Sequence, residues 1–246
     1  MTVTRTALVT GGTGALGQAI AVALHDAGHR VIVTCRQRGQ AEQAWLDTHA
    51  AAGREFLAYP VDVADYASCR ALADTLAADG LSVDILVNNA GVTRDASLRK
   101  MAADDWATVL RCNLDSMFNM TQPLIEGMTS RGWGRVVNIS SVNGFKGAFG
   151  QTNYGAAKAG VHGFTKSLAL EVARKGVTVN TVSPGYLDSP MVAAVPQSVL
   201  EEKILPQIPV GRLGQPAEIA ALVTFICSDS AGYMTGSNVA MNGGMY

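Results

Sequence analysis

A short apolar run that ends in a cluster of glycines constrains the fold of this chain more than any other feature. Residues Thr6–Val9 predict a strand, Thr10–Gly17 a glycine-rich turn, and Gln18–Ala27 a helix that ends at Gly28. Such a turn brings backbone N–H groups and the amino end of a helix close to a pyrophosphate. It therefore favours a dinucleotide site, with a tight turn that holds nothing as the alternative. A triphosphate loop is not expected, because Gln18 stands where its Lys would be needed.

The same alternation of apolar runs and helical segments continues along the chain. It predicts further strands at Val31–Thr34, Phe56–Val61, Gly134–Ile139 and Asn238–Met241, and a strand followed by a sharp polar turn over Ile85–Gly91. It predicts helices at Ala41–Ala52, Cys69–Ala78, Asp105–Met128 with an interruption near Asn113, and Pro216–Ser228. The 246 residues, 48% of them hydrophobic, contain no repeat or low-complexity linker. We therefore expect one α/β domain with a parallel sheet over residues 1–246.

Charge and cysteine usage exclude several classes of protein. A net charge of −1 and a pI near 6.4, without a basic block, argue against a nucleic-acid partner. No signal-like segment or membrane-length apolar stretch occurs, so we expect a cytoplasmic protein without membrane contact. The four cysteines form no CxxC pair and the four histidines no ligand spacing. We expect buried thiols in a reducing compartment and no metal site.

A tyrosine, a lysine and a serine suggest the chemistry. Tyr154 and Lys158 are four residues apart, so on a helix they share one face. Ser141 lies upstream, at the carboxyl end of the strand predicted at Gly134–Ile139. A nearby ammonium lowers the pKa of a phenol, which makes tyrosine a usable general acid or base. A hydroxyl beside it can hold a substrate oxygen, which implies carbonyl reduction or its reverse. An ordinary exposed Tyr–Lys pair is the alternative.

The residues after the second predicted strand bear on the choice of cofactor. Cys35-Arg36-Gln37-Arg38 lies where the adenosine ribose of a dinucleotide would be bound. No carboxylate stands there to accept the 2′-OH of NADH, whereas Arg36 or Arg38 could pair with the 2′-phosphate of NADPH. Arginines in an exposed turn are as often only solvated. The sequence leaves NADPH and NADH both open.

Several landmarks in order carry a family resemblance. They are the Thr10–Gly17 turn, Asn88-Asn-Ala-Gly91, Asn113, Ser141, Tyr154-x-x-x-Lys158 and Pro184-Gly185. Over essentially its whole length the chain resembles the short-chain dehydrogenase/reductase family. The resemblance implies a doubly wound sheet of seven parallel strands, NADPH or NADH as cofactor, and usually a homotetramer.

The resemblance also implies roles for individual residues. The catalytic set would be Ser141, Tyr154 and Lys158, with Asn113 anchoring a water-linked proton relay to Lys158. The cofactor would be bound by Gly11, Thr13, Gly14, Leu16, Gly17, Arg36, Arg38, Asp62, Val63, Asn89, Ala90, Gly91, Pro184 and Gly185.

Longer runs are similar to bacterial acetoacetyl-CoA reductases of polyhydroxybutyrate synthesis. They are Gly91–Asp95, Arg131–Arg135, Ser140–Gly144, Phe149–Tyr154 and Val177–Tyr186. This similarity implies NAD(P)H-dependent reduction of acetoacetyl-CoA, or a related 3-oxoacyl thioester, to the (R)-3-hydroxyacyl product. The substrate contacts would be Asp95, Ala148, Phe149, Gly150, Gln151, Gly185 and Tyr186.

Two alternative functions stay open at this point. One is a 3-oxoacyl-[acyl carrier protein] reductase of fatty-acid synthesis, on the same fold. The other is a dinucleotide-sensing regulator that catalyses nothing. The intact pair of Tyr154 and Lys158 speaks against the regulator, because a sensor needs only the glycine turn.

Some positions depart from the family pattern. Ala15 replaces the middle glycine of the turn, and its methyl group is tolerated beside a pyrophosphate only if its φ is negative. Gly14 and Gln40–Glu42 lack the basic residues that many NADPH enzymes carry. Pro196 replaces an arginine that resembles a CoA contact. It lies within Leu187–Val210, a segment rich in Pro, Ser and Met that predicts a substrate lid.

Overall fold

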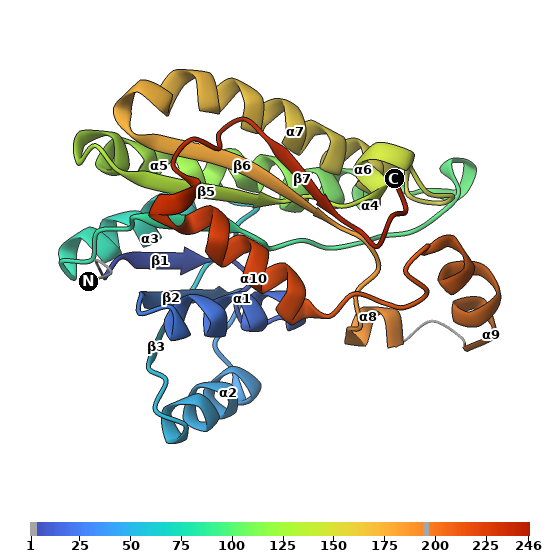
Figure 1. Cartoon of the computed structure of the whole chain (residues 1–246), viewed down its shortest axis with the longest axis horizontal. Helices are drawn as coiled ribbons and strands as arrows, with labels where there is room; N and C mark the ends of the chain where they lie inside the picture. The colour runs from blue at the N-terminus through green and yellow to red at the C-terminus, as the bar shows by residue number, and fades with distance from the viewer. Residues whose placement is uncertain (1–3, 194–196) are drawn as a thin grey trace.

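Seven parallel strands form a single sheet in the order β3-β2-β1-β4-β5-β6-β7 (Figure 1). The computed structural model describes residues 4–193 and 197–246. The strands are β1 (Thr6–Val9), β2 (Arg30–Cys35), β3 (Phe56–Pro60), β4 (Ile85–Asn88), β5 (Gly134–Ile139), β6 (Val177–Pro184) and β7 (Asn238–Met241). The strand order reverses between β1 and β4, which confirms the doubly wound α/β fold and the seven strands that the resemblance implies.

Helices cover both faces of the sheet (Figure 1). One face carries α1 (Ala15–Asp26), α2 (Gln40–Ala51) and α10 (Pro216–Cys227). The other carries α3 (Tyr66–Ala78), α4 (Ala103–Leu110), α5 (Ser116–Ser130) and α7 (Thr152–Val172). Among the described residues, no helix is long and apolar enough to cross a membrane.

The central strands are buried on both faces, because each face of the sheet packs against helices. Successive side chains of β1 alternate between two cores. Ala7 and Val9 pack with residues of α1 and α10, whereas Leu8 packs with residues of α3 and α5. All three side chains are fully buried. Double burial of this kind explains why the strands read as continuous apolar runs rather than as alternating patterns.

Most element bounds differ from the sequence prediction by one to three residues at one or both ends. Strand β2 is one residue longer at each end than predicted, and β3 ends one residue earlier, at Pro60. The strands β1, β5 and β7 have the predicted bounds. Helix α3 begins at Tyr66 rather than at Cys69, because the Asp65 carboxylate accepts a hydrogen bond from the backbone N–H of Ala67 at 3.1 Å and caps the helix. Helix α1 begins at Ala15, directly after Gly14, and so includes the last residues of the glycine turn.

The predicted interruption of the long helical region is present. A π-helical turn over Arg111–Asp115 joins α4 to α5, and Asn113 lies fully buried within it.

Short helices make up most of the segment predicted as a lid. They are α8 (Pro190–Ala193), α9 (Gln197–Val199), a π-helical turn (Leu200–Ile204) and a 3₁₀ turn (Leu205–Gln207). In Figure 1 α8 and α9 lie together at one end of the molecule, apart from the sheet. Pro196, where the sequence indicated a lost CoA contact, lies outside the described residues. The remaining short helices are α6 (Asn143–Lys146) and 3₁₀ turns at Leu98–Lys100, Ala173–Lys175 and Asp229–Ala231.

Candidate active site

A groove of about 1880 Å³ runs along the carboxyl ends of the strands, where open α/β sheets bind ligands. Every residue predicted to contact cofactor or substrate lines this groove except Gly150. Ser141, Tyr154 and Lys158 line it as well, whereas Asn113 lies behind its wall with no exposed surface. The fold thus brings into one groove residues that span most of the chain.

The glycine turn forms one end of the groove and has no room for side chains at two positions. Gly11 has a φ of +60°, and a Cβ on Gly17 would stand 2.2 Å from the carbonyl oxygen of Gly11. No non-glycine residue among those described has a positive φ. Ala15 therefore has the negative φ at which its methyl group is tolerated beside a pyrophosphate. The turn therefore presents bare backbone, as a bound pyrophosphate requires.

Thr10 and Asn89 lock this turn to the end of β4. The Thr10 hydroxyl accepts hydrogen bonds from the backbone N–H groups of Asn89 and Ala90, at 2.9 and 3.0 Å. The Asn89 side chain donates to the carbonyl oxygen of Thr10 at 2.9 Å. Thr10 was not among the predicted cofactor contacts, although a threonine that starts a glycine turn is able to bond a neighbouring strand end.

The adenosine end of the groove lies after β2. Arg36 and Arg38 are exposed there, and Arg38 donates to the side-chain oxygen of Gln43 at 2.8 Å. Burial raises the pKa of the Cys35 thiol. Sequence reasoning placed no carboxylate here, yet Glu42 from the first turn of α2 also lines the groove. Its carboxylate accepts a hydrogen bond from the backbone N–H of Gly39 at 3.0 Å, which caps α2.

Lys158 lines the groove and is almost completely buried. Its ammonium donates to the carbonyl oxygen of Ile139 at 2.8 Å, and only 3% of the residue is exposed. Burial lowers the pKa of Lys158 to about 8. Its Nζ lies 5.7 Å from the centre of the Tyr154 ring, as expected for residues one helical turn apart.

The protonation of Tyr154 differs from the sequence prediction. Burial raises the pKa of its phenol, the Ser141 hydroxyl lowers it, and Asp95 and Tyr186 raise it further. The prediction that Lys158 would lower this pKa is therefore wrong for the protein alone, because desolvation disfavours the charged forms of both side chains. A phenol that keeps its proton is suited to act as a proton donor.

Asn113 joins the π-helical turn to the segment after β4. Its side-chain oxygen accepts from the N–H of Val92 and its side-chain nitrogen donates to the carbonyl oxygen of Val92, both at 2.8 Å. A Cβ on Gly91 would stand 3.1 Å from that oxygen and 3.6 Å from Lys158 Nζ. Gly91 therefore lies close to both Asn113 and Lys158. Both polar atoms of the Asn113 side-chain amide are hydrogen-bonded to the backbone of Val92.

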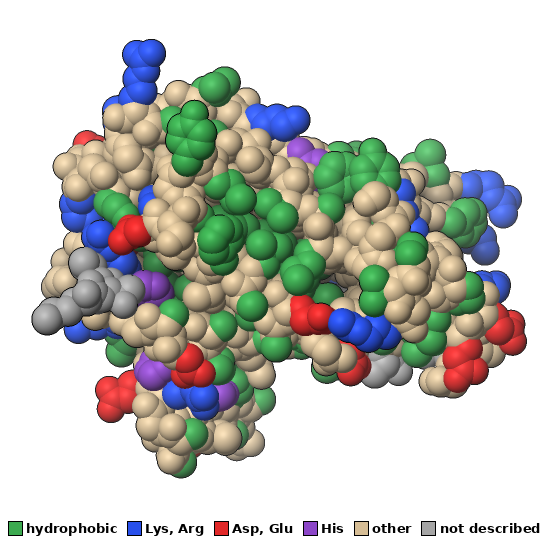
Figure 2. Space-filling view, in the orientation of Figure 1, with side chains coloured by type: hydrophobic (Ala, Val, Ile, Leu, Met, Phe, Trp, Pro, Cys, Tyr) green, Lys and Arg blue, Asp and Glu red, His purple; other side chains and the backbone are tan. Residues whose placement is uncertain are grey.

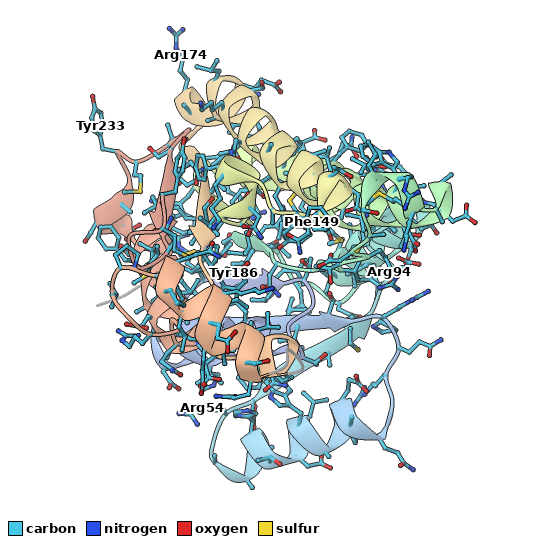
Figure 3. All side chains as sticks on the ribbon, turned by 90° about the vertical axis from the view of Figure 1, so that its right-hand side faces the viewer. Arg54, Arg94, Phe149, Arg174, Tyr186 and Tyr233 are labelled. Atoms are coloured by element: carbon cyan, nitrogen blue, oxygen red, sulfur yellow. The ribbon has the colours of Figure 1, made fainter. Side chains whose placement is uncertain are left out.

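The substrate end of the groove opens to one side of the molecule. Arg94, Phe149 and Tyr186 line the groove, and Figure 3 shows them on the side of the molecule that faces the viewer, away from Arg174 and Tyr233. Phe149 is 95% exposed, although it is large and apolar. Gly150 reaches no groove surface, but its carbonyl oxygen accepts from the N–H of Ala96 at 2.9 Å and holds this loop to the segment that follows Asp95.

Comparison with known proteins identifies the family. A family model described as enoyl-(acyl carrier protein) reductase matches residues 12–246. The acetoacetyl-CoA reductases of Cupriavidus necator and Rhizobium meliloti are 50% and 52% identical over 242 and 245 residues, with 98% of both chains covered in each case. The chain belongs to the short-chain dehydrogenase/reductase family. As a member of this family it is an oxidoreductase that uses a nicotinamide dinucleotide cofactor.

Other members of the short-chain dehydrogenase/reductase family are also similar. A 3-oxoacyl-[acyl-carrier-protein] reductase of Pseudomonas aeruginosa is 44% identical over 242 residues, which cover 98% of this chain and 97% of that relative.

The cysteines of this family member lie mostly inside the protein. All four cysteines are free, and three are buried, whereas Cys112 is half-buried beside the groove. Within residues 4–193 and 197–246, no group of three or more His, Cys, Asp or Glu side chains is placed to hold a metal ion.

Proposed function

We propose that this enzyme reduces acetoacetyl-CoA to (R)-3-hydroxybutyryl-CoA and supplies polyhydroxybutyrate synthesis in the cytoplasm. The observation that carries the proposal is the meeting of Tyr154, Lys158 and Ser141 beside the glycine turn in one groove. Full-length similarity to two proteins named acetoacetyl-CoA reductase supports the choice of substrate.

Each catalytic side chain has a separate task in this proposal. Tyr154 donates a proton to the oxygen of the 3-carbonyl, and the raised pKa of its phenol keeps that proton in place beforehand. The bound nicotinamide supplies the hydride. Lys158, with a pKa of about 8, is able to gain and lose a proton near neutral pH and so to return one to Tyr154. Asn113 holds the wall behind Lys158 through its two bonds to Val92.

Ser141 orients the substrate oxygen. Its hydroxyl oxygen accepts a hydrogen bond from the backbone N–H of Asn143 at 3.1 Å. That contact uses a lone pair and leaves the hydroxyl hydrogen to be donated, either to the carbonyl oxygen or to Tyr154.

A 3-oxoacyl-[acyl carrier protein] reductase is the second candidate, favoured by the 44% identity to the Pseudomonas aeruginosa enzyme. Initial rates with acetoacetyl-CoA, acetoacetyl-pantetheine and an acetoacetyl carrier protein, each with NADH and NADPH, separate the two. We expect kcat/KM to be highest for the CoA thioester, because remote CoA contacts supply binding energy that is used at the carbonyl. Equal values for CoA and pantetheine, with faster turnover of the carrier protein, would assign the enzyme to fatty-acid synthesis. No turnover of any thioester would favour the dinucleotide-sensing regulator.

We further propose a homotetramer, because two separate apolar faces remain on the described surface. One lies over α10 and the edge strand β7, where hydrophobic side chains gather in Figure 2, and includes Phe225 and Met241. The other lies on α3 to α5 and includes Trp106 and Phe118. Two self-complementary faces generate a tetramer with two-fold axes. Sedimentation should give four copies for the wild type and two for Phe118→Glu or Phe225→Glu, whereas a monomeric wild type would refute the proposal.

A further inference from the structure

A continuous chain of hydrogen bonds connects the substrate end of the groove to Ser141. The Asp95 carboxylate accepts from Gln151 Nε2 at 2.8 Å, and Gln151 Oε1 accepts from Asn143 Nδ2 at 2.9 Å. The backbone N–H of Asn143 then donates to Ser141 Oγ at 3.1 Å. Four side chains from three separate segments are therefore held in one line.

The charged end of this chain determines the direction of every amide in it. An ionised carboxylate only accepts hydrogen bonds, so Gln151 turns its nitrogen towards Asp95 and its oxygen towards Asn143. Asn143 in turn must present its nitrogen. The Oδ1 of Asn143 consequently has no hydrogen-bond partner among the described residues. It is buried, since only 7% of the residue is exposed. A buried acceptor left unpaired is unfavourable, so the orientation is imposed by the chain and not by Asn143 itself.

The position of Gln151 links this chain to Tyr154. Gln151 is the N-cap residue of α7, and its carbonyl oxygen accepts from the N–H of Gly155 at 2.7 Å. Asn143 is the first residue of α6, directly after the Ser141 loop. The Asn143 side chain thus connects the loop that carries Ser141 to the first turn of the helix that carries Tyr154.

Gln151 lines the groove, and its side-chain nitrogen has a second hydrogen that the bond to Asp95 does not use. Gln151 and Phe149 both line the groove. The second hydrogen is therefore available to a carbonyl oxygen in the groove, provided that the amide keeps its present orientation.

We propose that Asn143 is a positioning residue that holds the Gln151 amide with its nitrogen towards the thioester carbonyl of the substrate. This inference rests on the proposed function only in taking an acyl thioester as the group that meets Gln151. Asn143 itself does not contact the substrate in this proposal and acts through Gln151.

A pair of substitutions that reverses the direction of the hydrogen bonds between residues 95, 151 and 143 tests the proposal. Asn143→Asp places a second acceptor against Gln151 Oε1 and breaks the chain. In the double variant N143D/D95N, Asn at 95 can donate to Gln151 Oε1 and Asp at 143 can accept from Nε2, so the chain is complete again at the same net charge. Its Gln151 amide, however, points the opposite way.

We expect both variants to lose about tenfold in kcat/KM for acetoacetyl-CoA, mainly through KM, as for one lost hydrogen bond. The Kd of NADPH should change less than about twofold in both. The double variant should regain the thermal midpoint of the wild type while its kcat/KM stays below that of Asp95→Asn alone, the variant that keeps the Gln151 amide in its present direction but alters the predicted substrate contact at residue 95. Recovery of both would show that the chain is only a structural cross-link, and an unchanged kcat/KM in N143D would also overturn the proposal.

A double-mutant cycle between Asn143 and Gln151 covers the case in which the reversed hydrogen bonds do not form. If Asn143 acts through Gln151, then Asn143→Ala should raise KM in the wild type but have no further effect on KM in a Gln151→Ala background. Additive effects on KM would overturn the proposal. Turnover of acetoacetyl-CoA by the wild type is measured in the same series, so a failure of the proposed function is recognised separately.

Discussion

The ammonium of Lys158 is hydrogen-bonded at 2.8 Å to the carbonyl oxygen of Ile139, the last residue of β5. This bond ties α7 to the carboxyl end of the central sheet at the position where the catalytic side chains meet. Because the same side chain is almost completely buried, its pKa falls from 10.5 to about 8. A group that loses its proton so early must couple folding stability to pH.

The stability of this protein should therefore contain a contribution from Lys158 that rises with pH. Between pH 8 and pH 10 the unfolded chain keeps the Lys158 proton while the folded protein loses it, so the free energy of unfolding increases across this window. Relative to a Lys158→Met variant, the wild type should gain roughly 2–3 kcal/mol between these pH values. Urea unfolding of both proteins at several pH values measures the difference. A constant difference from pH 7 to pH 10 would show that Lys158 titrates normally.

Removal of the Tyr154 hydroxyl should abolish most of the reductase activity. Tyr154→Phe deletes the proton donor and little binding surface, so kcat should fall by about 10²–10⁴ while the Kd of the cofactor stays within a few-fold. Ser141→Ala should also lower kcat steeply. Rapid-mixing kinetics and cofactor fluorescence titration give both quantities, and a Tyr154→Phe enzyme with wild-type kcat would refute the mechanism.

A side chain at Gly17 should lower the stability of the protein more than one at Gly14, three residues earlier in the same turn. A Cβ on Gly17 would stand 2.2 Å from the backbone oxygen of Gly11, whereas one on Gly14 would meet that oxygen at 3.3 Å. Gly17→Ala should therefore destabilise the protein by about 1–3 kcal/mol, because backbone must move, and Gly14→Ala by less than about 1 kcal/mol. Thermal unfolding of the two variants without cofactor checks this order. Equal stabilities would mean that the turn relaxes freely.

The two exposed arginines after β2 should contribute to NADPH binding. We propose that both cofactors are used, and that replacing Arg36 and Arg38 together by Ala raises KM for NADPH by about one to two decades while KM for NADH changes little. Arg174→Ala is the matched control, since that exposed arginine lies at the opposite end of the molecule (Figure 3). Unchanged KM for NADPH in the double variant would show that these side chains only face solvent.

Local patterns were enough to predict a parallel α/β sheet, whereas its number of seven strands was implied by the family resemblance. Apolar runs such as Thr6–Val9 and Gly134–Ile139 are buried on both faces, so their composition alone distinguishes them from surface segments. The glycine turn could also be predicted from the sequence, because only a residue without a side chain fits beside the carbonyl oxygen of Gly11. The spacing of Tyr154 and Lys158 fixed their shared helical face, since the period of a helix does not depend on tertiary context.

Properties that arise from burial and from partners distant in sequence were decided by the tertiary structure. The pKa of Tyr154 is raised and not lowered, because desolvation depends on how completely the folded protein excludes water. The bonds of Asn113 to Val92, and of Asn143 to Gln151, join segments whose approach no local pattern encodes. The sequence by itself determined which groups could act in this protein. Packing determined which of them carry a proton and which are held in place by a hydrogen bond.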